Sequence, residues 1–137
     1  MKNLATKYRE AQFFAHAAHN LVQGNTFFSD HEFLGEAYEA YTKAYDEIIE
    51  RIIGSGDKVN PLVLTLEAAK DADNNHDLSG NQDSYDLFYG LLDYEKQFCA
   101  QIKTIIADGV THGTSNLLEG LADESEMRQY KIKQRIL

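Results

Sequence analysis

Two histidines and two carboxylates within residues 1–50 are of the types that bind metal ions. They are His19, His31, Asp46 and Glu50. Imidazole nitrogens and carboxylate oxygens hold iron and manganese in helical proteins, where they project from facing helices. Taken singly, each residue is more simply explained as an exposed or structural side chain of an amphipathic helix. Their spacing decides between these two interpretations.

The spacing excludes a site built by one helix alone. His31 and Asp46 are fifteen residues apart, which on one helix separates them by about 22 Å along the axis but by only about 60° around it. If two copies of this helix pack antiparallel about a two-fold axis, His31 of one copy lies beside Asp46 and Glu50 of the other. His19, near the end of the preceding helix, can join His31 of its own chain. The spacing therefore predicts a metal site shared by two subunits.

The elements that must position these residues are helices. The chain has one proline, and its apolar residues recur at helical spacing almost throughout. The pattern predicts long helices over about residues 3–23, 29–53 and 84–107 and from about residue 114 to the terminus. A short helix beginning at Pro61 and a polar loop over residues 71–84 lie between the second and third long helices.

Local signals mark where the helices begin and end. Ser29 with Glu32 three residues later has the form of a capping box, which places Ser29 at the N-cap of the second long helix. Phe28 and Phe33 are placed as the hydrophobic staple of that helix. Further end signals are Gly24 after the first helix, Asn60 capping the short helix, Gly54 to Gly56 after the second helix and Gly109 after the third.

The order of the elements predicts the fold. Tight turns join the first pair and the last pair of long helices, so each pair is antiparallel, whereas the long middle connection can return along the bundle. This is an all-α, ferritin-like four-helix bundle with a short extra helix in the crossover. We expect residues 1–137 to form a single domain.

Composition narrows the class of protein. The formal net charge is −9, which disfavours a protein that coats nucleic acid. The one cysteine, Cys99, cannot form an internal disulfide and fits a reducing compartment. No apolar run approaches the ~18 residues that a membrane helix needs, and no charged-then-apolar leader opens the chain. We expect a soluble, cytoplasmic protein without a membrane association.

The sequence resembles the Dps family, the mini-ferritins also called DNA-binding proteins from starved cells. The family motif is a histidine ending the first helix, a second histidine twelve residues later, an aspartate fifteen further on and a glutamate after four more. It reads here as "HAAHN" for His19, "FFSDHEFLGE" for His31, and "YDEIIER" for Asp46 and Glu50. The segments "NPLVLTLEAA" and "HGTSNLLEGL" also resemble the family, and the similarity spans nearly the whole chain.

The resemblance implies a function in iron storage and oxidative stress. It implies a ferroxidase, an oxidoreductase acting on metal ions, with sites at a two-fold subunit interface. His19 and His31 would come from one subunit, and Asp46 and Glu50 from its partner. It further implies a hollow shell, usually of twelve subunits, that oxidises Fe(II) with hydrogen peroxide or oxygen and stores Fe(III).

One departure from the family affects the site itself. Many members have a further acidic ligand four residues after the second histidine, where this chain has Gly35. Glu36 is adjacent, but on a helix it points roughly 100° away from position 35, so it is a weaker candidate ligand. This departure motivates an alternative function, a ferritin-like helical-bundle structural or interaction protein that has lost ferroxidase activity.

Other departures lie at the edges of the predicted site. Asn20 replaces the tryptophan common after the first histidine, and the chain has no tryptophan. Asn116 stands where the last helix often carries an aspartate near the iron-entry pore, although Glu119 and Asp123 remain candidate pore residues. His16, three residues before His19, is a weaker candidate metal ligand.

We predict that the assembled protein does not bind duplex DNA usefully, despite the family's name. Only Lys2 precedes the first helix as a free basic group, and the closing "YKIKQRIL" suits a docked helix more than a solvated arm. Twelve chains of this charge would repel phosphate at long range. A gel-shift titration at about 0.15 M salt, where exposed charges are screened beyond ~8 Å, should give no retarded band at low micromolar protein. A clear band would contradict the prediction.

Overall fold

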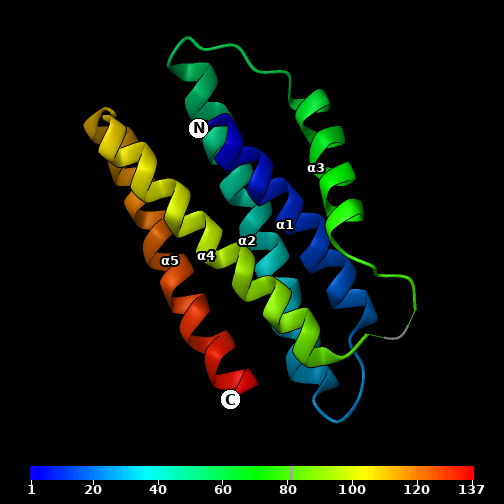
Figure 1. Cartoon of the computed structure of the whole chain (residues 1–137). Coiled ribbons are helices and arrows are strands. Elements are labelled where there is room, and N and C mark those ends of the chain that lie inside the picture. The colour runs from blue at the N-terminus through cyan, green and yellow to red at the C-terminus, as the bar shows by residue number, and fades with distance from the viewer. Residues whose placement is uncertain (81) are drawn as a thin grey trace.

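Five helices make up this computed structural model, which describes residues 1–80 and 82–137. The helices are α1 (Lys2–Leu21), α2 (Phe27–Gly54), α3 (Pro61–Asn75), α4 (Ser84–Asp108) and α5 (His112–Ile136). The four long helices run side by side, and the shorter α3 lies outside them along α1 (Figure 1). This arrangement confirms the all-α four-helix bundle with an extra helix in the crossover. None of the five helices has both the length and the apolar composition needed to cross a bilayer.

The core lies between the faces that the periodicity predicts. On α1, the helically spaced apolar side chains from Leu4 to Ala18 are buried, as is Val22 directly after the helix. On α2, Leu34, Tyr41 and Ile52 are buried as well. Each helix therefore has an apolar stripe facing its neighbours and a charged outer face. The largest fully buried side chains are Tyr8, Tyr41, Phe14, Phe88, Phe98, Leu4, Leu34, Ile48, Leu87, Leu91, Leu118 and Ile132.

The start of α2 differs from the prediction. The helix begins at Phe27 with Thr26 as its N-cap, so Ser29 lies inside the first turn and is not the cap. The Ser29 hydroxyl donates to the Thr26 carbonyl at 3.1 Å instead. The Thr26 hydroxyl makes no capping bond; it donates to the buried Asp30 carboxylate at 2.7 Å and accepts from Arg135 Nη2 at 2.9 Å. A side-chain interaction with Asp30 thus competes successfully with the predicted capping box.

The predicted hydrophobic staple at this end is also wrong. Phe28 is 86% exposed, whereas Phe33 is half-buried and packs against the core. With the helix beginning two residues before Ser29, Phe28 already belongs to the first turn and points outward. The aromatic ring that covers this end is that of Phe27, which packs against the core.

The remaining helix boundaries agree more closely with the predicted positions. Asn60 caps α3 as predicted, accepting hydrogen bonds from the backbone N–H groups of Leu62 and Val63. The loop predicted over residues 71–84 is wrong in its first part, because α3 continues to Asn75 with Ala68 and Ala72 buried. Residue 81 of that loop lies outside the described residues. The last helix begins two residues earlier than predicted.

Of the two glycines predicted to follow α1 and α4, one directly ends its helix. Gly109 directly follows α4 with φ +96°, a left-handed conformation that glycine adopts without a Cβ clash. Gly24 has φ +97° but lies two residues beyond the α1 cap, Val22, so α1 ends slightly before the predicted position.

A carboxylate sits at the centre of the bundle. Glu95 of α4 is fully buried, and its Oε1 accepts hydrogen bonds from Arg128 Nε of α5 and from the Tyr41 hydroxyl of α2, each at 2.5 Å. Burial acts to lower the pKa of Arg128, but the Glu95 charge and hydrogen bond, together with the nearby Tyr41 and Tyr8, outweigh burial and raise this pKa. The interaction joins three helices and neutralises the buried charge.

We predict that Arg128→Met destabilises the fold strongly. The substitution keeps the apolar stem but leaves the Glu95 carboxylate buried without its counter-ion, which typically costs about 3–5 kcal/mol. Urea unfolding at pH 7 measures the difference. Lys133→Met on the exposed face of α5 is the matched control and should change stability by less than about 0.5 kcal/mol. Equal unfolding midpoints for the two variants would contradict this role for Arg128.

Candidate metal centre

His19 and His31 face each other across the α1–α2 contact. His19 lies in the last turn of α1 and His31 near the start of α2, and their rings stack with centroids 3.6 Å apart and planes 18° from parallel. His19 Nδ1 lies 2.6 Å from the carbonyl oxygen of His31, and His31 Nδ1 lies 2.8 Å from the carbonyl oxygen of His19. The structure thus brings the two predicted histidine ligands together as a reciprocal pair.

This pairing determines which nitrogen of each ring is free to bind a metal. A carbonyl oxygen can only accept, so each Nδ1 must carry the hydrogen and donate it. In the neutral ring the lone pair is then on Nε2. Metal-binding histidines usually donate their other N–H to a carbonyl or carboxylate, which orients the ring and raises its basicity. Both rings therefore have the tautomer and support that metal ligands need.

Gly35 lies directly beneath the His19 ring. A Cβ placed at this position would lie 3.0 Å from His19 Cε1 and 3.1 Å from Nδ1, closer than a Cβ normally approaches. The sequence pattern alone presents Gly35 only as a missing ligand. The glycine itself could have indicated this close contact. Glycine in a helix interior is unfavourable by about 1 kcal/mol, so its presence there needs a structural explanation.

Aromatic rings surround the histidine pair. Phe27 stacks on His31 with centroids 4.9 Å apart, and Tyr38 lies 6.0 Å from the His19 ring. The exposed His16 stacks on Tyr38 at 4.4 Å and lies 6.3 Å from His19, measured between ring centroids. His16, the weaker candidate ligand, is thus held against Tyr38 at the edge of the pair.

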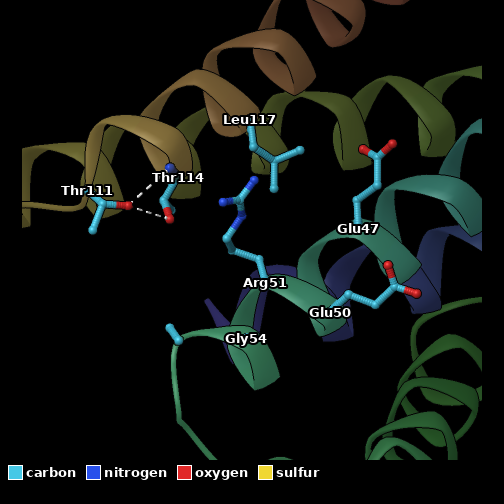
Figure 2. Close-up of a pocket in the computed structure, with 8 residues that line it drawn as sticks. Glu47, Glu50, Arg51, Gly54, Thr111, Thr114 and Leu117 are labelled. Atoms are coloured by element: carbon cyan, nitrogen blue, oxygen red, sulfur yellow. Dashed lines mark hydrogen bonds between the residues drawn. The ribbon is translucent and has the colours of Figure 1, made fainter.

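The predicted carboxylates lie further along α2 on the protein surface. Asp46, Glu50 and the weaker candidate Glu36 are all exposed. Glu50 borders an open pocket of about 680 Å³ between the end of α2 and the start of α5. Figure 2 shows Arg51 reaching toward α5 while Glu50 points away from it. Over residues 1–80 and 82–137, no three His, Cys, Asp or Glu side chains gather into a cluster that could hold a metal.

The candidate pore residues are also exposed. Glu119 and Asp123 lie four residues apart on the outer side of α5. The hydroxyl of Ser115 donates to Glu119 at 3.2 Å. Their part in iron entry stays a prediction.

The interior of the bundle is a poorer candidate for a metal centre. Helical bundles of the di-iron type build their metal centres from inward-pointing carboxylates and histidines. Here the central carboxylate, Glu95, is already bound by the Arg128 guanidinium, whose positive charge opposes a cation at this level of the bundle. The histidine pair, at the protein surface, is the better candidate.

Comparison with known families agrees with the architecture. The model of the ferritin-like domain family matches residues 3–136. The chain belongs to the ferritin-like family. No curated protein matches its sequence. Membership of the ferritin-like family supports a general role in iron storage or iron oxidation.

In this ferritin-like chain, an ion pair fixes the helix turn that carries His31. Asp30, which is 2% exposed, accepts hydrogen bonds from Arg135 Nε at 2.8 Å and from Arg135 Nη2 at 2.9 Å. Burial acts to raise the pKa of Asp30, but the hydrogen bonds from Arg135 and Thr26 outweigh it and hold the pKa below 3.8. The end of α5 is thus clamped to the start of α2. Sequence reasoning missed this contact.

We predict that Arg135→Met destabilises the protein in a pH-dependent way. A carboxylate with a depressed pKa in the folded state adds stability above its unfolded pKa of about 3.8, and this stability is lost as the pH falls through the folded pKa. Losing the charged hydrogen bonds should cost roughly 1.5–3 kcal/mol at pH 7. Urea unfolding at pH 7 and below pH 3 should show the gap from wild type narrowing in acid. A gap that stays constant with pH would contradict the role of Asp30.

Proposed function

We propose that this ferritin-like protein is a Dps-like ferroxidase and iron-storage protein. The reciprocal hydrogen bonds between His19 and His31 carry the proposal, because they leave both Nε2 atoms free to bind a metal and fix both rings. Asp46 and Glu50 of the partner subunit would supply the oxygen ligands. Carboxylates suit hard iron ions and tolerate oxidation of Fe(II) to Fe(III), while imidazoles complete the ligand shell.

The stacking of the two rings suggests that each binds its own Fe(II). Nitrogen lone pairs lie in the ring planes, and two planes 18° from parallel at a stacking distance of 3.6 Å do not converge on one ion. Two-metal sites commonly hold their ions about 3.5–4 Å apart. Two Fe(II) ions give one electron each to hydrogen peroxide, forming two Fe(III) and two hydroxide ions. Paired transfer avoids releasing a hydroxyl radical.

A hydrophobic surface beside the carboxylates supports the two-fold dimer. Leu62, Val63 and Leu66 of α3 are 68%, 47% and 62% exposed, and we call them the α3 ridge. The start of α3 is joined to α2 next to Asp46, because the Tyr45 hydroxyl donates to the carbonyl oxygen of Pro61 at 3.4 Å. Neighbouring exposed apolar side chains mark a subunit interface. A second copy covering the α3 ridge would also approach Asp46.

The larger assembly follows from the family resemblance. Dps proteins form hollow shells, usually of twelve subunits, and we propose the same for this chain. A net charge of −9 per subunit would give such a shell a negative surface that attracts Fe(II). Fe(III) produced at the interfaces would then be stored inside the shell.

We predict that Asp46→Ala combined with Glu50→Ala strongly slows iron oxidation by the protein. Anaerobic Fe(II) is mixed with the protein, peroxide is added, and Fe(III) formation is followed by absorbance. Removing both oxygen ligands should slow the reaction at least about 10–100-fold, the loss that changes beside a metal site already cause. Asp108→Ala combined with Glu126→Ala, which removes two exposed carboxylates elsewhere, is the matched control and should retain the wild-type rate.

The same variants test the rival function. If wild type oxidises Fe(II) no faster than the variant lacking both carboxylates, the ferroxidase proposal is wrong. A retained dimer without iron, in a crystal soaked in Fe(II), would then favour a structural or interaction protein. Anomalous density between His31 and Glu50 of the partner subunit would support the ferroxidase. Light scattering should show one assembly state for every variant, and a monomeric wild type would exclude a shared site.

A further inference from the structure

Gly35 is more than the position of a lost ligand. The His19 ring rests on the α2 backbone at Gly35, where a Cβ would lie 3.0 Å from His19 Cε1 and 3.1 Å from Nδ1. We infer that Gly35 is a positioning residue that seats His19 in its metal-binding orientation. A consequence is that an acidic residue at position 35 weakens the site. The inference rests on the proposed function only for the role of His19 as a ligand.

The His19 ring has little freedom to move away from a side chain at position 35. Its Nδ1 is held 2.6 Å from the carbonyl oxygen of His31, and its face is stacked on the His31 ring at 3.6 Å. The His31 ring is fixed in turn by the His19 carbonyl and by Phe27 on its other side. A shift of one ring therefore breaks or bends the hydrogen bonds of both.

The effect of a side chain at position 35 follows from this geometry. The substitution Gly35→Ala adds only a Cβ, so it isolates the steric effect on His19. The substitution Gly35→Asp adds the same Cβ together with the carboxylate that many Dps proteins have there. If seating of His19 dominates, both substitutions weaken metal binding. If the missing carboxylate dominates, Gly35→Asp strengthens binding and only Gly35→Ala weakens it.

The first experiment measures the ring without any metal. A crystal structure of the metal-free Gly35→Ala protein should show the His19 ring shifted by a few tenths of an ångström, with its Nδ1 farther from the carbonyl oxygen of His31 than the present 2.6 Å. Gly120→Ala is the matched control, because Gly120 is also inside a helix but a Cβ there meets nothing within 4 Å. A His19 ring left in place in the Gly35→Ala structure would overturn the inference.

Thermal unfolding provides a second metal-free test. Alanine is a better helix former than glycine, so Gly120→Ala should raise the melting temperature. Gly35→Ala should lower it, because the clash with His19 outweighs the gain in helix propensity. In a His19→Ala background the clash is removed, and Gly35→Ala should become stabilising. The same sign in both backgrounds would contradict contact between Gly35 and His19.

The third experiment measures the ligand role with Co(II), whose visible absorption reports its coordination. Titrations of the assembled protein should show that Gly35→Ala and Gly35→Asp each weaken Co(II) binding about 10–100-fold, while Gly120→Ala binds as wild type does. Binding by Gly35→Asp that is as tight as wild type or tighter would overturn the inference. Failure of wild type to bind Co(II) would refute the proposed function, while the two metal-free tests would still decide the seating role of Gly35.

Discussion

The Glu95 carboxylate, fully buried where α2, α4 and α5 meet, is the constraint that organises the rest of the molecule. A charge in that position needs a counter-ion and further hydrogen bonds, and it obtains them from Arg128 and Tyr41. The polar side chains at the centre of the bundle therefore stabilise the fold and do not form a metal site. Residues able to bind a metal lie instead at the surface of the α1–α2 pair, where a single chain offers imidazoles but not the predicted carboxylates beside them.

The helices and their buried faces agree well with the periodicity of the sequence, because the apolar residues that recur at helical spacing form the face that an amphipathic helix buries. The misplaced features have local physical causes. The Ser29 capping box failed because Thr26 and Asp30 interact with Arg135, a residue over a hundred positions away. The last turns of α3 were predicted as loop because polar residues surround Ala72, whose burial depends on packing against α1.

The candidate site was predictable in part. Spacing along α1 and α2 was enough to single out His19 and His31, since the two helices are joined by a short turn. The contact between the His19 ring and Gly35 was not predictable, because it depends on how closely α1 and α2 approach each other. In the proposed site, Asp46 and Glu50 would come from a second subunit. The packing of two subunits cannot be predicted from the periodicity of one chain.

The two contacts that flank His31 differ greatly in sequence separation, and this difference bears on the order of folding. His19 and His31 are twelve residues apart, whereas Asp30 and Arg135 are 105 apart. Closing a short loop loses less chain entropy than closing a long one, and contacts between neighbouring segments form faster. The α1–α2 hairpin can therefore form its histidine pair before α5 docks. In kinetic terms, the imidazole half of the site belongs to an early folding unit, and the clamp that holds it is added last.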